Sequence, residues 1–394
     1  MNYNFDEVIN RRATNSLKWD VEKHELPLWV ADMDFRVAPC ITDALKKRVD
    51  EGIFGYAYLQ DSWKDAVTSW WKTRHNCVLH PNRLLFALGA IPALATAIRA
   101  FTNPGDRILL LSPVYNAFFS VIRNNGRIVE ESPLVYENEH YSVNFDDLER
   151  RMSMPDTVML VLSNPHNPTG NIFTKDELSK IADLSEKYSV MVVSDEIHCD
   201  LVDPGLQYTP YVTIGEKAHQ NSLSLMSATK TFNVAGIQTS IVYTEDNRVF
   251  NAMKRALNND EDGEVNVFSA LVTEAAFTHG AKWLDELREY VYANKEYVRK
   301  FCKKNIPNAH VINEGASYLL WIDISRYLSS VLPTSAEWTR RLRHSEGLIV
   351  SPGTDFGKET GRNFFRLNVA CPRLTLSDAM LRLKKFTDKL LLGA

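Results

Sequence analysis

The amino-acid sequence predicts an α/β protein in which helices cover both faces of a mostly parallel sheet. Between about residues 84 and 245, short apolar runs alternate with helical patterns, which is typical of parallel sheets. The runs are almost wholly apolar, as expected for strands that are buried on both faces. The chain has 394 residues, more than the roughly 250–300 at which a single hydrophobic core stops growing. We therefore expect two domains.

The elements of the first domain follow one another along the chain. Helical patterns separate its strands, notably at Ala93–Phe101 and Lys175–Lys187. Each expected strand is a short aliphatic run bounded by polar or turn-forming residues. The expected strands are Leu84–Leu88, Arg107–Leu111, Thr157–Leu162, Val190–Val193, Leu223–Met226 and Ser240–Tyr243.

A longer helical pattern, Trp283–Lys304, is expected to lead into a second, C-terminal domain. Residues before about position 48 are expected to pack with that domain, so the smaller domain is discontinuous. The predicted division is a large domain of residues 49–284 and a small domain of residues 1–48 and 285–394.

Charge and hydropathy argue against several classes of function. A net charge of −4 provides no basic surface for nucleic acid or anionic lipid. No apolar stretch approaches the ~20 residues that span a bilayer. The first residues, Met1–Asp6, form neither a signal peptide nor a basic transit segment. We expect a cytoplasmic protein that binds neither nucleic acid nor membrane.

The cysteines and histidines do not suggest a metal site. The five cysteines are scattered and contain no Cys-x-x-Cys, so neither a disulfide framework nor a thiolate site is indicated. The ten histidines show no ligand spacing, and we expect no metal. Each cysteine is interpreted as a small buried apolar residue. Cys199 and Cys371 flank motifs described below, and a reactive role for them stays open.

Lys230 is the first candidate for chemistry. It lies in the segment Ser227–Gly236, directly after the apolar run that ends at Met226. A lysine at the carboxyl end of a buried strand is desolvated, so it can lose its proton and attack a carbonyl as an amine. A lone lysine here would be interpreted as a solvated loop charge. Two further motifs favour the reactive amine.

Asp195 and Asn167 follow two other predicted strands. Asp195 ends the apolar run that begins at Val190, at the sheet edge where ligands of α/β proteins gather. Asn167 belongs to Asn164-Pro165-His166-Asn167-Pro168-Thr169-Gly170, whose two Asn-Pro steps interrupt regular structure and predict a rigid loop. An amine, a carboxylate and an amide at successive strand ends match the needs of pyridoxal phosphate. The amine binds its aldehyde, the carboxylate keeps the ring nitrogen protonated, and the amide donates to its phenolic oxygen.

These three segments, in this order, resemble the fold-type I pyridoxal-phosphate enzymes of the aspartate aminotransferase superfamily. The resemblance extends to Leu348–Gly357 and Phe365–Asn368 in the C-terminal part of the chain. It implies a mostly parallel seven-stranded sheet in a large domain and a smaller discontinuous α/β domain. Further segments are similar to the cystathionine β-lyases of the MalY/PatB type, namely Trp29–Phe35, Phe54–Tyr56, Asp195–His198 and Asn368–Arg373.

With such a cofactor indicated, the junction Leu88–Pro92 becomes a candidate phosphate site. The amides of Ala90 and Ile91 would begin a helix after Gly89, where free N–H groups and the positive helix end favour an anion. Pro92 suits a first helical turn. A plain structural turn is the alternative interpretation. Hydroxyl donors would come from Ser227 and Thr229.

The resemblance assigns further residues. Tyr115 is placed over the cofactor ring, with a core tyrosine as the alternative, and Tyr56 is placed at the phosphate of a neighbouring subunit, which implies a homodimer with shared sites. His198 stands where related aminotransferases often have a tyrosine near the cofactor, with a packed loop histidine as the alternative. Arg366 would bind the substrate carboxylate bidentately. Gln238 departs from the pattern, because many relatives have a phosphate-binding arginine there.

The subfamily resemblance implies β-elimination from cystathionine, cysteine or other S-substituted cysteines, which releases pyruvate, ammonia and a thiol or hydrogen sulfide. Lys230 would take the Cα proton. Two alternatives stay open: an aminotransferase that uses the same residues, and a regulatory protein that holds a transcription factor. The sequence does not identify the leaving group; residues 131–141 and 207–211 are candidates to line its pocket.

Overall fold

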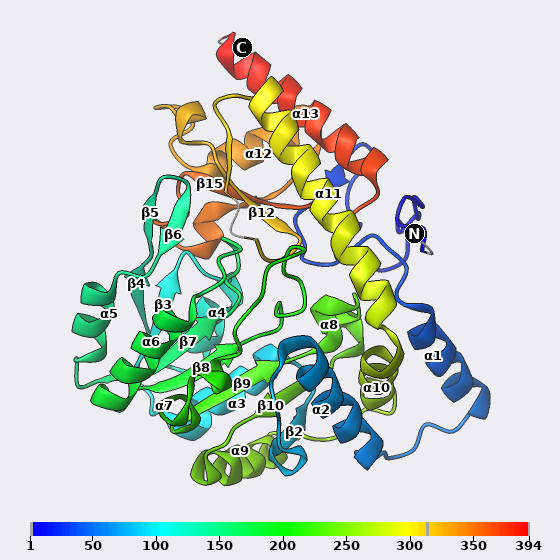
Figure 1. Ribbon diagram of the computed structural model, residues 1–394. Helices are drawn as coiled ribbons and strands as arrows, with labels where there is room; N and C mark the ends of the chain where they lie inside the picture. The colour runs from blue at the N-terminus through cyan, green and yellow to red at the C-terminus, as the bar shows by residue number, and fades with distance from the viewer. Residues whose placement is uncertain (1–2, 313–314, 393–394) are drawn as a thin grey trace.

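The computed structural model describes residues 3–312 and 315–392. A seven-stranded sheet forms the lower half of the molecule in Figure 1. Neighbouring strands in it are parallel except for β10, which is antiparallel to β9 and β2. The mostly parallel seven-stranded sheet expected from the sequence is thus confirmed. Its order is β2 (Leu84–Ala87), β10 (Ser240–Tyr243), β9 (Ser222–Met226), β8 (Met191–Asp195), β7 (Thr157–Ser163), β3 (Arg107–Ser112) and β4 (Ile128–Pro133).

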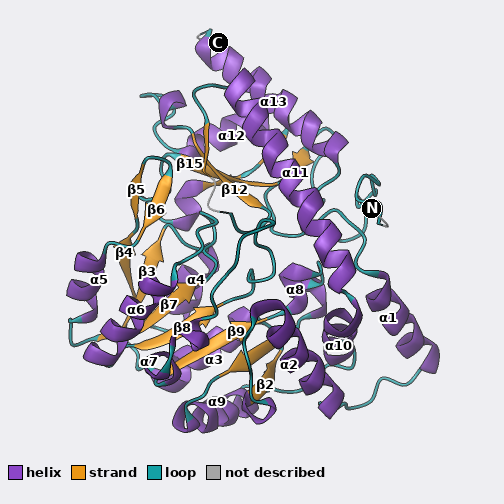
Figure 2. Ribbon diagram, viewed as in Figure 1, coloured by secondary structure: helices purple, strands orange, loops and turns teal. Residues whose placement is uncertain are grey.

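Helices cover both faces of this sheet (Figure 2). Successive residues of β3 face opposite sides: Ile108 and Leu110 belong to one buried apolar cluster, and Leu109 and Leu111 to another. This alternation follows from the two-residue period of a strand, and a strand buried on both sides must be apolar throughout. The first cluster includes residues of α3 (Ala90–Phe101), α4 (Asn116–Asn124) and α9 (Asn247–Asn259); the second includes residues of α5 (Phe145–Met152) and α6 (Lys175–Tyr188).

A smaller antiparallel sheet lies above the large one in Figure 1, beside the long helix α11 (Ala281–Asn305). Its order is β11 (His310–Ile312), β12 (Leu319–Asp323), β15 (Phe364–Asn368) and β14 (Ser351–Pro352). Helices α12 (Ser335–Glu346) and α13 (Arg373–Leu391) pack against each other beside it.

The N-terminal segment contacts both halves of the chain. Strand β1 (Leu26–Pro27) pairs in parallel with β13 (Leu348–Ile349), and α1 (Pro39–Glu51) packs against α10 (Ser269–His279). The expected domain boundaries, 48/49 and 284/285, fall inside α1 and α11, so that division stays a prediction. The remaining elements are α2 (Asp61–His75), β5 (Val135–Glu137), β6 (His140–Ser142), α7 (Glu216–His219) and α8 (Ala228–Thr231).

The predicted strands and helices are present, with ends that differ by at most three residues, and the strand Ser240–Tyr243 has its predicted bounds. Strand β4 was not predicted from its residues. It is an edge strand whose Glu130 pairs with Arg107 and Arg151, and these charges hide the apolar pattern. Among the described residues, no helix combines the length and the apolar character required to cross a membrane.

Candidate functional site

The predicted site residues converge at the carboxyl ends of the central strands. Asp195 is the last residue of β8, Asn167 lies in the loop after β7, and Lys230 lies on the short helix α8 after β9. These three strands are neighbours in the sheet and run parallel. Because carboxyl ends of parallel strands meet at one edge, side chains that are far apart in sequence come together there.

The Lys230 side chain is half-buried, and its amine is poised to lose its proton. Its Nζ donates to the Ala31 carbonyl oxygen at 2.9 Å. Burial lowers the pKa of Lys230 to about 8, and the positive charge of Arg366 acts in the same direction. The carboxylates of Asp32 and Asp195 oppose this shift without cancelling it. A lysine with this pKa is partly neutral at pH 7 to 8 and can act as a nucleophile or a base.

Asp195 is a buried carboxyl group with little compensation for its charge. Burial raises its pKa to about 7, while the Ile197 amide, 3.3 Å from Oδ1, and nearby Lys230 lower it. His198 lies close by. Burial, with further effects of Lys230 and Arg366, lowers its pKa to about 3, so its ring is neutral. Its Nε2 is buried and has no hydrogen-bond partner in the described residues.

Arg366 comes from β15 of the small sheet and reaches Asn167 of the large one. Its Nη1 donates to Asn167 Oδ1 at 3.1 Å, and its Nη2 donates to the Trp29 carbonyl at 3.0 Å. The guanidinium lies 4.6 Å from the centre of the Phe356 ring. Burial lowers the pKa of Arg366 to about 10, and its Nε is buried without a partner among the described residues. A buried guanidinium with an unused donor is suited to a carboxylate.

The candidate phosphate site is the first turn of helix α3. This helix begins at Ala90, and its N-cap is Gly89, which has no side chain to cap the first turn. The amides of Ala90 and Ile91 therefore point out of the helix end. Ser227 caps α8: its Oγ accepts from the Thr229 amide at 3.0 Å and lies 2.6 Å from the Thr239 carbonyl, to which it donates. The Ser227 proton is thus already engaged in this structure.

Two predicted aromatic residues differ in their placement. Tyr115 is the N-cap of α4, and burial raises its pKa, with smaller effects of Arg366 and Asp195 that place it beside both. Tyr56 lies on the segment between α1 and α2 with its side chain fully exposed, so a single chain does not bring it into the cluster.

Gln238 has a left-handed backbone with φ of 59°.

The cysteines beside the site are buried thiols. Burial raises the pKa of Cys371 to about 12 and that of Cys199 well above its usual value. Cys199 also forms a group with His75 and Asp200 whose potential ligand atoms lie within 4.8 Å of one another. The Asp200 carboxylate in this group already accepts hydrogen bonds from Trp70 and Thr231, and His75 Nε2 lies 2.9 Å from its Oδ1. Sequence spacing did not reveal this cluster.

The residues that sequence reasoning missed act through the backbone. The Ala31 carbonyl accepts from Lys230 and also from the Tyr318 hydroxyl at 3.0 Å. Ala31 lies in the segment Trp29–Phe35, which was noted only for its resemblance to a subfamily. Every residue has a backbone carbonyl oxygen, so the residue type at position 31 does not indicate that this oxygen accepts from Lys230. A local sequence pattern also cannot predict a contact between residues so far apart in the chain.

Comparison with known proteins agrees with this geometry. Residues 23–383 match the family described as aminotransferase class I and II. The chain is 37% identical to cystathionine beta-lyase PatB of Bacillus subtilis, over 97% of this chain and 99% of the relative. The structure is similar to a PLP-bound putative aminotransferase from Clostridium difficile (TM-score 0.93, 35% identity, 98% and 100% of the two chains). It is also similar to cystalysin from Treponema denticola, which contains pyridoxal 5'-phosphate (TM-score 0.93, 30% identity, 99% and 100%).

Proposed function

Because the chain belongs to the class I and II aminotransferase family, we propose that it is a pyridoxal-phosphate-dependent carbon–sulfur β-lyase. Its substrates are L-cystathionine, L-cysteine and other S-substituted cysteines, and its products are pyruvate, ammonia and a thiol. The fold is the fold-type I pyridoxal-phosphate transferase fold. One observation supports this function most strongly: a lysine of lowered pKa and a buried aspartate lie at one edge of the large sheet, where an arginine of the small sheet hydrogen-bonds to Asn167.

The buried polar atoms fit pyridoxal phosphate. Burial raises the pKa of Asp195, Lys230 offsets this only in part, and a protonated ring nitrogen would supply a further positive charge. His198 Nε2 is buried and unpartnered among the described residues, as expected of a group that awaits a polar ligand. The first-turn amides of Ala90 and Ile91, with the Thr229 hydroxyl, provide donors for a phosphate. The Ser227 hydroxyl would join them by turning away from the Thr239 carbonyl.

We assign the following roles. When bound, pyridoxal phosphate supplies an acceptor for the electron pair that remains when Cα loses its proton. Lys230 would bind the cofactor and, once free, take the Cα proton. Asp195 would hold the ring nitrogen protonated, Asn167 would donate to the phenolic oxygen, and His198 would contact the cofactor. Tyr115 would pack against the ring. Arg366 would orient the substrate carboxylate, so that the bond between Cβ and sulfur is the one that breaks as the thiolate leaves.

An aminotransferase is the second candidate, because a similar solved structure bears that name and the same residues would serve it. The two reactions diverge after Cα deprotonation. A thiolate is a good leaving group, so elimination competes with return of a proton to the cofactor. The 37% identity to a cystathionine β-lyase along nearly the whole chain favours elimination.

The assembly and location are further parts of the proposal. The segment between α1 and α2 exposes Ile53, Phe54, Tyr56 and Tyr58, which suits burial against a second copy of the chain. Tyr56 would then reach the phosphate in the site of the other subunit of a homodimer. We place the enzyme in the cytoplasm, where its five free cysteines stay reduced and its action on cysteine yields hydrogen sulfide. Residues 49–284 form the cofactor-binding domain in this proposal.

The test is product stoichiometry with L-cystathionine. The purified enzyme should release homocysteine, pyruvate and ammonia in equal amounts without any added 2-oxo acid. A panel of S-substituted cysteines, followed by pyruvate release, identifies the preferred leaving group. Turnover that requires 2-oxoglutarate and yields glutamate without free thiol would establish the aminotransferase instead.

A further inference from the structure

The segment Trp29–Met33 passes beside the site, and side chains from distant parts of the chain donate to all five of its carbonyls. Asn368 Nδ2 donates to the Val30 carbonyl at 2.7 Å and to the Asp32 carbonyl at 2.6 Å. Asn233 Nδ2 donates to the Met33 carbonyl at 3.0 Å. Asn233 follows Lys230 on the large-domain side, and Asn368 follows Arg366 on the small sheet. Both halves of the site therefore hold the same five residues.

Buried charges fix this segment from its other side. Lys18 is fully buried, and its Nζ donates to Asp34 Oδ2 at 2.8 Å. Arg11 donates to Asp34 Oδ1 at 2.7 Å and to Asp32 Oδ2 at 2.8 Å. Removing one charged side chain from such a network leaves its partner with an uncompensated charge, which is strongly unfavourable. The carbonyls of the segment are therefore acceptors at fixed positions.

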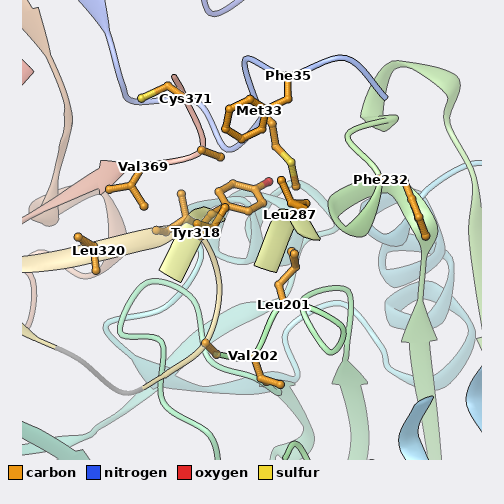
Figure 3. Close-up of a cluster of buried hydrophobic side chains, with 14 of the residues drawn as sticks. Met33, Phe35, Leu201, Val202, Phe232, Leu287, Tyr318, Leu320, Val369 and Cys371 are labelled. Atoms are coloured by element: carbon orange, nitrogen blue, oxygen red, sulfur yellow. The ribbon is translucent and has the colours of Figure 1, made fainter. Parts of the chain in front are cut away.

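The Ala31 carbonyl is the one that receives the Lys230 amine. Lys230 Nζ donates to this oxygen at 2.9 Å, and the Tyr318 hydroxyl donates to the same oxygen at 3.0 Å. A carbonyl oxygen has two lone pairs, so these two donors use both. The Tyr318 side chain is 1% exposed and lies among buried apolar residues that include Met33, Leu287 and Val369 (Figure 3). Its ring is held by packing, and its hydroxyl is aimed at Ala31.

We propose that Tyr318 is a positioning residue for the Lys230 amine: its hydroxyl occupies one lone pair of the Ala31 carbonyl oxygen and leaves only the other for Lys230. The amine thus has a defined resting place whenever it is not bonded to the cofactor. Because Tyr318 and Lys230 share the Ala31 carbonyl oxygen, that oxygen accepts only weakly from Lys230. It therefore stabilises the protonated form of the amine less than an unshared carbonyl would. The relevance to catalysis rests on the proposed role of Lys230; the contact itself does not.

The effect on protonation has a definite sign. The groups that act on Lys230 are Arg366, Asp32 and Asp195, with the neutral ring of His198 nearby. None of these changes when only the Tyr318 hydroxyl is removed. The Ala31 oxygen then gains a free lone pair and becomes a better acceptor for an ammonium group. Since a hydrogen bond to the charged form favours that form, the pKa of Lys230 should rise.

The experiment measures the Lys230 amine directly, in the full-length chain without cofactor. Cyanate modifies unprotonated amines, and peptide mass spectrometry reports the rate at Lys230 as a function of pH. Tyr318→Phe should raise the pKa of Lys230 by up to about 1 pH unit, because one whole net hydrogen bond is the upper limit for strengthening a bond that already exists. Near pH 7, carbamylation of Lys230 should therefore slow by up to about tenfold. No cofactor or substrate takes part, so this result is independent of whether the lyase function is correct.

A matched control separates this effect from a loss of stability. Tyr243 is also 1% exposed, and its hydroxyl donates to Glu245 in the strand-end region of β10. Tyr243→Phe should leave the pKa of Lys230 unchanged, even if it lowers the melting temperature as much as Tyr318→Phe does.

A second variant moves the pKa in the opposite direction and keeps the ring and hydroxyl in place. Site-specific 3,5-difluorotyrosine at position 318 is a stronger donor to the Ala31 carbonyl, so the pKa of Lys230 should fall. It also provides the test if Tyr318→Phe does not fold. Equal pKa values for Lys230 in the wild type and the folded variants, or shifts of the same sign in both, would overturn the proposal.

Discussion

Substitution of Arg366 by lysine tests how the substrate carboxylate is held. The guanidinium donates to Asn167 Oδ1 and to the Trp29 carbonyl, lies on the Phe356 ring, and keeps a buried Nε without a partner among the described residues. Lysine preserves the positive charge. It has no planar fork, however, and cannot bond the protein and both carboxylate oxygens at once. The comparison therefore isolates geometry from charge.

The magnitude follows from the number of bonds lost. A bidentate contact becomes a single one, so the variant loses one charge-assisted hydrogen bond of about 1.5–3 kcal/mol. At 1.36 kcal/mol for each factor of ten, kcat/KM should fall roughly 10- to 150-fold. KM should rise because binding weakens, and kcat should fall because the carboxylate no longer orients the Cα–H bond.

Continuous detection of pyruvate release from L-cystathionine gives both constants. Arg362→Lys is the matched control, because Arg362 also donates to a backbone carbonyl, that of Pro333, yet its side chain is 48% exposed. It should leave both constants within about twofold, since exposed substitutions seldom perturb their surroundings. If Arg366→Lys, folded and loaded with cofactor, matches the wild type, another group binds the carboxylate.

Further predictions concern the cofactor, pH and assembly. Lys230→Ala should bind pyridoxal phosphate noncovalently, show no borohydride-fixed label and lose turnover by several orders of magnitude. Asp195→Asn should slow Cα deprotonation more than Asp195→Glu, measured by isotope exchange at Cα; the reverse order would indicate a structural role. In the cofactor-free protein the pKa of Asp195 is raised from 3.8 to about 7, so its contribution to stability is present below pH 4 and lost as pH rises through 7. Urea unfolding at pH 5 and pH 8 should therefore show a smaller pH dependence for Asp195→Asn than for the wild type. Mixed dimers of Lys230→Ala and Tyr56→Phe chains should exceed the mean activity of their parents, because one site regains both residues; activity at or below that mean after proven subunit exchange would contradict a shared site.

Residues that end the central strands could be found from the sequence because their position follows from a local pattern. A short apolar run identifies a buried strand, and the polar residues that end it or follow it closely lie at the ligand-binding edge. Lys230, Asp195 and Asn167 were all located in this way. Arg366 required resemblance to a family, because it lies on the other sheet and nothing local relates β15 to the ends of β7, β8 and β9.

Two kinds of feature stayed beyond sequence patterns. Edge strand β4 contains Glu130, which pairs with Arg107 and Arg151, and charged residues are normal at the edge of a sheet. The segment Trp29–Met33 is irregular, and its order depends on donors more than 180 residues away for Met33, Ala31 and Val30. Such contacts depend on tertiary packing, which a local pattern does not encode.

The segment Trp29–Met33 also relates the two cations of the site to each other. Its Trp29 carbonyl accepts from Arg366, and its Ala31 carbonyl accepts from Lys230. The two side chains are therefore held at a fixed separation, at which the charge of Arg366 contributes to lowering the pKa of Lys230. In the proposed function, a substrate carboxylate bound to Arg366 would neutralise that charge, so the proton affinity of a free Lys230 amine would rise on binding. The amine would then be a poorer base while the site is empty and a better one when a substrate is in place to give up its Cα proton.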